Sequence, residues 1–263
     1  MNLEKQDMKN TAGQQPGPAK RRKLRPGLLV LDLLIAGLVI AGLYLILKPV
    51  IIHKLQDNLT ADLIDAYEQG EGTILIDPTA LVVEGEEVEY VEENETFSTT
   101  ATSEGSQPDL TPTPAPTPTA APAKVVVKAI GRMKIPIINL DMPIAEGATK
   151  YNLRVAIGHY SNSSDFGEPG YCIFLGHRMY TYGRHFNRLG EVAPGDQIIL
   201  EDKNTRYIYQ VDLIETILPA DLLAALHAET EEKRIMLVTC TPVRVASHRL
   251  LVKGILVRTE PLG

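Results

Sequence analysis

The sequence has only two cysteines, Cys172 and Cys240, and no lysine or arginine between residues 55 and 123. Two cysteines allow at most one disulfide, which excludes a scaffold held together by several bridges. From residue 124 onward the chain carries 17 basic and 15 acidic residues, so this part lacks the basic excess that is typical of nucleic-acid binding. We therefore expect no nucleic-acid partner.

One long apolar run lies near the N-terminus. Leu28 to Leu47 offers about 20 mostly apolar residues, enough for a helix to cross roughly 30 Å of hydrocarbon. Five basic residues in "KRRKLRPG" precede the run, whereas Lys48 and Lys54 follow it. The positive-inside tendency then predicts a cytoplasmic N-terminus and an extracellular remainder. A cleavable signal peptide is the alternative, but the run is long and no small-x-small site follows closely.

The segments that follow differ in composition. The stretch "LQDNLTADLIDAYEQG" predicts a helix, and an acidic stretch comes after it. Residues 98–123 are rich in Thr and Pro and poor in aromatic and branched apolar residues, which predicts a disordered linker. The predicted order is a cytoplasmic basic tail (1–27), a transmembrane signal-anchor (28–47), a juxtamembrane helix and acidic segment (48–97), the linker (98–123) and a folded domain (124–263).

The domain from residue 124 has the pattern of an all-β fold. Short apolar runs separated by turn residues predict strands in "KVVVKAIGRMKIPIINLDMPI", "YCIFLGH", "DQIILED", "TRYIYQVDLIETI", "RIMLVTC" and "HRLLVKGILV". Helical spacing occurs in "PADLLAALHAET". Many short strands with little helix favour a barrel or a sandwich, and the continuous apolar runs predict strands covered on both faces.

Candidate chemistry lies at the ends of these strands. Cys240 ends one predicted strand and Arg249 begins the next, while "YCIFLGHR" sets His177 beside a glycine at the end of a third. A nucleophilic cysteine needs a base or an ion-pair partner, because the thiolate is the reactive form. A guanidinium can stabilise the negative charge that acyl transfer builds on oxygen. The remaining candidate partners in the domain are His159, His185, His227 and His248.

Each of these residues also has a purely structural interpretation. Cys240 can form an extracellular disulfide with Cys172, His177 can serve only as a hydrogen-bonded strand-end histidine, and Arg249 can make an ordinary surface ion pair. We expect His159 to lie in a polar loop, and His248, which is adjacent to Arg249, to help only in ordering that strand.

Three motifs together resemble one family. "LGHR", "LVTCTP" and "HRLLVKG", in this order and at these separations, are similar to the sortases, the membrane-anchored cysteine transpeptidases of mainly Gram-positive bacteria. The resemblance covers residues 124–263 and includes "IGHYSNSSDFGEPGYCIFLGHR". It implies a sortase-type eight-stranded β-barrel, with His177 as general acid/base, Cys240 as nucleophile and Arg249 as the residue that orients substrate and oxyanion.

The resemblance also implies substrates. The donor would be a secreted protein with a Leu-Pro-x-Thr-Gly-like sorting signal, cut after the Thr, and the acceptor would be an amino group of a cell-wall precursor or of another protein. The sequence calls for no cofactor and no metal. Sortases usually have Thr-Leu-x-Thr-Cys, and Met236 stands here in place of the first Thr, which concerns local packing more than the reaction. Cys172 is then expected to be a small buried residue.

Several alternatives remain at the level of sequence. A single N-terminal span favours a class B- or D-like sortase over a pilin-polymerising one, which generally has a second span. The rivals outside the family are a wall-lytic cysteine peptidase, an L,D-transpeptidase, and a non-catalytic, disulfide-closed wall-binding module. The acidic stretch "EGEEVEYVEENE", with "ILIDPTALVV" ahead of it, either repels the anionic membrane or closes over the cleft as a lid near Arg178, Arg244 and Arg249.

Overall fold

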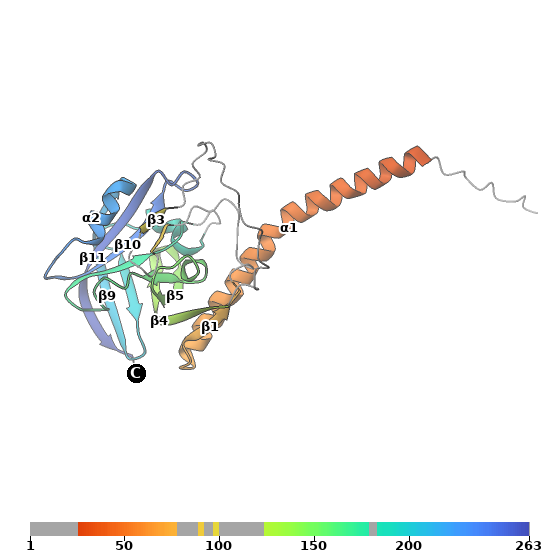
Figure 1. Ribbon diagram of the computed structural model, residues 1–263. Helices are drawn as coiled ribbons and strands as arrows, with labels where there is room; N and C mark the ends of the chain where they lie inside the picture. Colours follow the sequence, from red (N-terminus) through yellow and green to blue (C-terminus); the bar gives the residue numbers. More distant parts are fainter. Residues whose placement is uncertain (1–25, 78–88, 92–96, 100–123, 179–182, 263) are drawn as a thin grey trace, which may run out of the picture. The chain divides into compact units, whose positions relative to one another are not determined.

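The computed structural model describes residues 26–77, 89–91, 97–99, 124–178 and 183–262 (Figure 1). The basic tail, most of the acidic stretch and residues 100–123 of the linker lie outside the described residues, so the predictions that fall on them stay predictions. The chain forms two compact units, Met1–Leu47 and Lys48–Gly263.

The longest helix, α1, covers Pro26–Glu68. The apolar run and the juxtamembrane helix, which the sequence suggested as separate elements, are thus one continuous helix. Its first part is long and apolar enough to cross a membrane by length and composition, and none of that apolar window is buried. Large apolar side chains such as Leu38 and Leu45 are 73% and 70% exposed, as expected for a surface that meets lipid.

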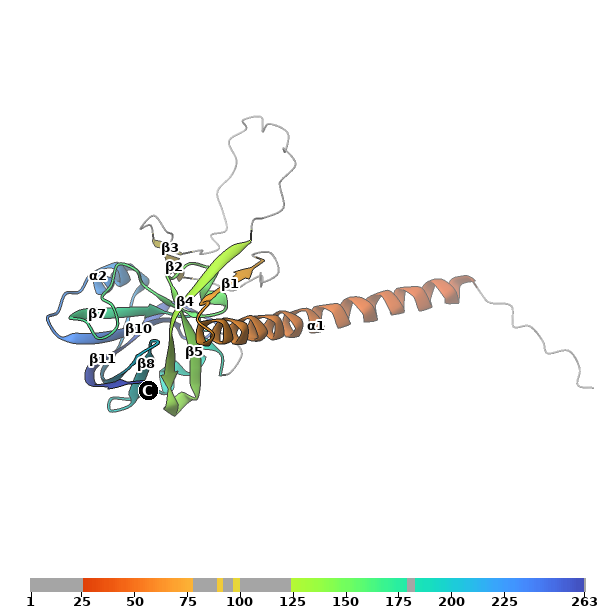
Figure 2. The ribbon, with the colours of Figure 1, turned by 90° about the horizontal axis from the view of Figure 1, so that it is seen from below.

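Eight strands of the second unit close into a barrel. They follow the ring order β4, β5, β6, β7, β10, β11, β9 and β8, and a pairing between β4 and β8 completes the ring (Figure 2). The strands are β4 (Val125–Ile135), β5 (Leu140–Glu146), β6 (Ile157–His159), β7 (Gly170–Leu175), β8 (Gln197–Glu201), β9 (Thr205–Ile217), β10 (Lys233–Thr241) and β11 (His248–Pro261). The predicted eight-stranded barrel is confirmed.

The central strands of the barrel are buried on both faces. Cys172 and Phe174 of β7 belong to the main core, whereas Ile173 and Leu175, which alternate with them, belong to a second apolar cluster. This second cluster includes Leu222 and Leu226 of α2 (Leu222–Leu226), and their packing covers the outer face of β7, β10 and β11. A strand side chain alternates between faces, so a continuous apolar run is what a two-sided strand requires.

Short 3₁₀ helices make several of the connections between the strands. They are η1 (Pro136–Ile138), η2 (Asn152–Arg154), η3 (His185–Glu191) and η4 (Pro219–Asp221). Proline begins η1 and η4, where its fixed φ suits the first turn and its missing N–H costs nothing. Two further short strands, β2 (Glu89–Val91) and β3 (Phe97–Thr99), pair with each other, so the last residues of β3 lie inside the segment that the sequence assigned to the linker.

A third apolar cluster joins the juxtamembrane half of α1 to the barrel. Leu63 of α1 is fully buried together with Ile76 of β1 (Thr73–Ile76) and with Val127 of β4. β1 pairs antiparallel with the beginning of β4 and adds a ninth strand outside the closed ring. Thr60 of α1 also donates a hydrogen bond to the carbonyl of Val155, at 2.8 Å. This half of α1 is therefore part of the folded unit.

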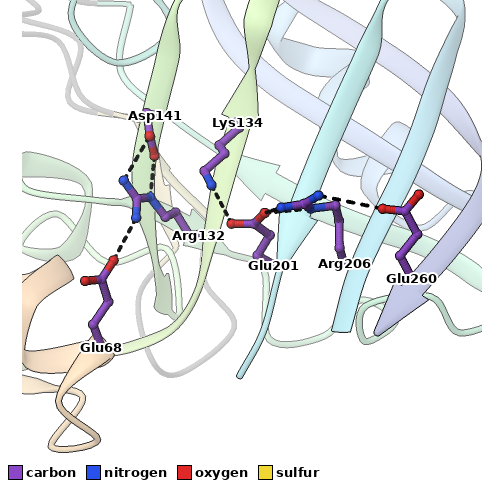
Figure 3. A network of polar contacts seen from close by, with 7 residues as sticks. All are labelled: Glu68, Arg132, Lys134, Asp141, Glu201, Arg206 and Glu260. Carbon is purple, nitrogen blue, oxygen red and sulfur yellow. Dashed lines mark hydrogen bonds and ion pairs between the residues drawn. The ribbon is translucent and has the colours of Figure 1, made fainter. Parts of the chain in front are cut away.

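Ion pairs cross the surface of the same unit (Figure 3). Arg132 on β4 forms a bidentate ion pair with Asp141 on β5, at 2.5 and 2.9 Å. It also forms an ion pair with Glu68 at the end of α1, at 2.8 Å. Next to it, Glu201 accepts from Lys134 at 2.6 Å and from Arg206 at 2.7 Å. We call the seven residues labelled in Figure 3 the ion-pair ladder: Glu68, Arg132, Lys134, Asp141, Glu201, Arg206 and Glu260. Every charge that it contains has a partner of the opposite sign.

Candidate active site

Strand pairing brings the three predicted site residues to one end of the barrel. β7 and β10 run parallel, with Leu175 beside Val238, so both chains leave the sheet at the same edge. Two residues further along each chain are His177 and Cys240. β10 and β11 run antiparallel with Cys240 directly opposite Arg249, and side chains opposite each other in a sheet lie on the same face. The strand register therefore places the strand-end residues His177 and Cys240 at the same end of the barrel, as expected.

Two hydrogen bonds fix the end of β7 against β10. The amide of Gly176 donates to the carbonyl of Val238 at 3.1 Å. The hydroxyl of Thr239 donates to the carbonyl of Gly176 at 2.8 Å and is buried. These bonds hold the residues that immediately precede His177 and Cys240, so the two predicted site residues follow directly on positions that are fixed to each other.

His177 and Cys240 line the same small pocket. Its walls are formed by Leu175, Gly176, His177, Val238, Thr239 and Cys240, and its volume is about 10 Å³. That volume is about the least that can hold one water molecule. The Cys240 side chain is half-buried, which is the partial exposure that a reactive thiol needs.

The His177 ring is buried and neutral at physiological pH. Burial and, to a smaller extent, the positive charge of the nearby Arg154 lower its pKa to about 4. Its Nε2 atom is buried and forms no hydrogen bond with any residue that the structure describes. A buried polar atom of this kind calls for an explanation, and a nitrogen kept available for proton exchange with a substrate or a thiol supplies one.

Arg249 is held by the loop that precedes its own strand. Only 3% of the residue is exposed. Its Nη1 atom donates to the carbonyls of Ala246 and His248, at 2.8 and 3.0 Å. The guanidinium is therefore tied to the β10–β11 connection beside Cys240, which differs from the exposed surface ion pair of the structural interpretation.

Arg178 is a further charge that the sequence reasoning did not assign to the reaction. Burial lowers the pKa of its guanidinium, and the proximity of Cys240 acts in the opposite direction. Its Nη2 atom occupies the space that a side chain at position 190 would fill, 2.7 Å from an ideal Cβ on Gly190. In the sequence, the position of Arg178 directly after His177 in "GHR" was the signal that could have pointed to it. A guanidinium in this position attracts a thiolate at Cys240.

The other histidines lie in different environments. His159 is the last residue of β6 and is 3% exposed, so its placement in a polar loop is wrong. Its ring contacts Phe166 and Phe174, and its Nε2 atom lies 3.2 Å from the carbonyl of Ser164. The paired strands β5 and β7 on either side of β6 explain the burial. His248 begins β11 and its Nδ1 atom lies 2.9 Å from the hydroxyl of Ser247.

Two further histidines complete the set. His227 is exposed, and its Nδ1 atom lies 2.9 Å from the carbonyl of Leu223. His185 is 3% exposed and packs edge-to-face on His177, with the ring centroids 6.2 Å apart. Of the four remaining candidates, His185 is therefore the one that contacts the His177 ring.

The two cysteines form no disulfide with each other and lie in unlike surroundings. Cys172 is fully buried in the barrel core and pairs with Ile235, five residues before Cys240. Burial raises the pKa of the Cys172 thiol well above its ordinary value, so Cys172 stays protonated. The expected small buried residue is confirmed, and the structure does not contain the disulfide of the alternative interpretation. Met236 is likewise fully buried, on the face that α2 covers.

Comparisons with known proteins find relatives of the barrel domain. A family model described as the sortase domain matches residues 133–257. Over 133 residues the chain is 30% identical to sortase A of Bacillus anthracis, covering 51% of this chain and 62% of the relative. Over 131 residues it is 32% identical to sortase D of Bacillus subtilis, covering 48% and 63%. It is also 35% identical over 91 residues to YwpE of Bacillus subtilis, a sortase candidate by name, covering 35% and 86%.

The chain belongs to the sortase family. The matched region spans less than two thirds of the sortase A and sortase D relatives. Because these relatives carry different class letters, the subclass stays a prediction. Among the residues that the structure describes, no group of three or more His, Cys, Asp and Glu side chains could hold a metal ion.

Proposed function

We propose that this sortase is a cysteine transpeptidase that cuts a Leu-Pro-x-Thr-Gly-like sorting signal and transfers the acyl part to an amino group of a cell-wall precursor. The observation that carries the proposal is the pocket that His177 and Cys240 share at the common end of β7 and β10. Arg249 lies opposite Cys240 on the neighbouring strand, so nucleophile, base and fixed cation meet at one place.

The reaction follows from these three groups. His177, neutral because its pKa is about 4, accepts the proton of the Cys240 thiol. The thiolate attacks the carbonyl carbon of the substrate Thr, and a C–S bond forms while the Thr–Gly C–N bond breaks. The proton on His177 passes to the amino group that leaves, and a thioacyl-enzyme remains.

The second half of the reaction reverses the roles. The acceptor amine attacks the thioester carbonyl and gives its proton to His177. The C–S bond breaks, and the leaving Cys240 thiolate takes this proton from His177 to restore the thiol. In both halves negative charge develops on the carbonyl oxygen, and the guanidinium of Arg249 stabilises it. Arg178, which interacts electrostatically with Cys240, favours the thiolate, which is the attacking group in the first half and the leaving group in the second.

Membrane anchoring belongs to the same proposal. α1 contains one segment that is long and apolar enough to span a bilayer, and the basic residues precede it in the sequence. An N-terminus in the cytoplasm and a catalytic domain outside the cell follow from the positive-inside tendency. Secreted proteins and wall precursors are then the substrates that the site can reach.

The test uses the full chain in detergent micelles with fluorogenic sorting peptides and a scrambled peptide as control. We expect cleavage of a Leu-Pro-x-Thr-Gly-like peptide, transfer of its acyl part to triglycine or to diaminopimelate, and a trapped thioacyl adduct that mass spectrometry locates on Cys240. Cys240→Ala should abolish both steps, whereas Cys172→Ala, the matched cysteine variant, should keep substantial activity. Unmodified Cys240 during turnover, or full activity in Cys240→Ala, would refute the proposal.

A further inference from the structure

Three consecutive residues, Arg184, His185 and Phe186, link α1 to His177. Arg184 contacts α1, the His185 ring packs on the His177 ring, and the amide of Phe186 donates to the His177 carbonyl at 3.0 Å. We call these three residues the brace. Its contacts lie within the unit formed by Lys48–Gly263.

The α1 end of the brace is a guanidinium with three acceptors from adjacent helix residues. Arg184 Nη1 donates to the carbonyl of His53 at 3.0 Å, and Nη2 donates to Oε1 of Gln56 at 3.2 Å. Nη2 also forms an ion pair with Oδ1 of Asp57 at 3.0 Å. The Arg184 side chain is 11% exposed and Gln56 is fully buried. This geometry fixes Arg184 on one face of α1 and does not resemble a mobile surface pair.

The His177 end of the brace carries backbone strain. His185 has φ +42°, in the left-handed region that residues other than glycine rarely adopt. Such a conformation is unfavourable for a residue with a side chain and persists only where the surroundings enforce it. The His185 ring meets the His177 ring at an interplanar angle of 85°, and both of its nitrogens are buried without a hydrogen bond to any described residue.

Phe186 completes the contact with the strand end. It is fully buried, and its ring lies against Gly176 where any larger residue would collide with it. The brace therefore touches the residue before His177, the His177 carbonyl and the His177 ring. The pocket shared by His177 and Cys240 is lined by six residues, and none of them belongs to the brace. The brace therefore contacts His177 and Gly176 without forming part of the pocket wall.

We propose that Arg184 and His185 are positioning residues, and that the juxtamembrane half of α1 orients the His177 ring toward Cys240 through them. The inference rests on the proposed function, because it assigns His177 a task in the reaction. Its consequence is that the helix which carries the apolar segment also contributes to the catalytic rate. A shift of about 1 Å in a catalytic group can cost up to roughly 100-fold in rate, so a modest change in the brace is measurable.

The kinetic test compares Arg184→Met with Arg188→Met in the full chain. Arg188 is a matched control, since it lies in η3 four residues after Arg184, is 17% exposed, and is paired with Glu191 and with the carbonyl of Ile138. We expect Arg184→Met to lower kcat about tenfold with KM within twofold, Arg184→Lys to recover part of the loss, and Arg188→Met to keep the wild-type kcat. Equal losses in both Met variants would reduce the brace to a general stabilising element.

A second variant approaches the brace from the helix and avoids its buried residues. Asp57 is 64% exposed, so Asp57→Ala leaves the packing intact. We expect about a threefold drop in kcat, because two of the three acceptors remain, and recovery in Asp57→Glu. Asp62, exposed on the same helix and outside the brace contacts, supplies the control Asp62→Ala. A wild-type kcat in both Arg184→Met and Asp57→Ala would overturn the proposal.

A third measurement does not require activity and separates this inference from the proposed function. In full chain labelled with ¹⁵N-histidine, the ring signals of His177 are assigned by their loss in His177→Asn. We expect Arg184→Met to shift them and Arg188→Met to leave them in place. If the wild type cleaves no sorting peptide, the proposed function fails while the shift still tests the brace. Unmoved His177 signals in Arg184→Met would refute the brace whatever the activity.

Discussion

The end of the barrel that carries Cys240, which we call the rim, differs from the ion-pair ladder in whether its polar groups have partners. On the ladder, Arg132, Glu201 and Arg206 each have partners of opposite charge at 2.5 to 2.9 Å (Figure 3). At the rim, Nε2 of His177 and both ring nitrogens of His185 are buried without a hydrogen bond to any described residue. An unsatisfied buried polar group costs about 1–3 kcal/mol. The ladder therefore pairs its charges, whereas the rim retains buried polar groups at a cost in stability, which is consistent with the proposed roles of His177 and His185.

The largest expected effect sharpens the difference between two buried histidines. His177→Asn should lower kcat by roughly 100- to 10,000-fold, the range for the loss of a general acid/base. His159→Asn should keep most of the activity but lose stability, because His159 packs on Phe166 and Phe174 and contacts the Ser164 carbonyl. Peptide cleavage and urea denaturation of both variants measure the two effects. An inactive His159→Asn beside an active His177→Asn would reverse the assignment.

The next effect concerns the fixed cation at the rim. Arg249→Ala should slow peptide cleavage by about 3 kcal/mol of transition-state stabilisation, on the order of 100-fold, if Arg249 supplies an oxyanion donor. Arg249→Lys should be impaired less, because it keeps the charge and loses the planar fork. Arg258→Ala, on the same strand with a side chain that is 62% exposed, is the control. Wild-type rates in both Arg249 variants would leave it a structural residue.

Two buried histidines at the rim should make the free energy of unfolding depend on pH. Burial lowers the pKa of His177 to about 4, and burial, with His177 and Arg184 nearby, lowers that of His185 to about 3. In the unfolded chain both titrate near 6.5, so below that pH the unfolded state binds more protons. As the pH is lowered from 6 to 4, the free energy of unfolding should fall by up to about 1.4 kcal/mol per pH unit for each histidine.

A substitution at His185 tests this slope. His185→Asn removes one titrating ring, and Asn tolerates a positive φ better than most residues, so it should remove about half of the decrease. Urea unfolding at a series of pH values measures the slope, and His227→Asn, at an exposed position, is the control. A full wild-type slope in His185→Asn would mean that His185 is not a source of the pH dependence.

The smallest effect is expected on the ladder. Arg132→Met should lower the free energy of unfolding by at most about 1 kcal/mol, because Asp141 and Glu68 are 44% and 58% exposed and water screens the pairs. The difference from wild type should shrink in added salt, and peptide cleavage should stay unchanged. Loss of kcat in Arg132→Met would contradict the separation of a stabilising region from a catalytic one.

Much of the fold could be predicted from the sequence because its strands are long, apolar and separated by turn residues. β4, β5, β7 and the strands from β8 to β11 all appear where the apolar runs predicted them. β6 was missed because it has only three residues, and β1 because "TILI" is short and lies far from the domain. Short strands are stabilised by their neighbours in the sheet and leave little periodic pattern of their own.

The site was predictable in its residue types and in part of its geometry. His177, Cys240 and Arg249 were chosen from strand ends and from the motif resemblance, and the register of β7, β10 and β11 brings them to one edge. The roles that we propose for Arg178, His185 and Arg184 were not predicted from strand ends or from the motif resemblance. Their contacts join η3, α1 and the end of β7, which are far apart in the chain.

By itself the sequence determined the apolar helix and the all-β domain, and it predicted which residues react, since each of these depends on local composition or on a short motif. Only the tertiary structure decided that the barrel closes through β4 and β8, that Cys172 stays in the core, and that α1 continues onto the domain to hold Arg184. These features depend on burial and on contacts between distant segments. They arise when the chain folds, because apolar surface leaves water only where several elements meet.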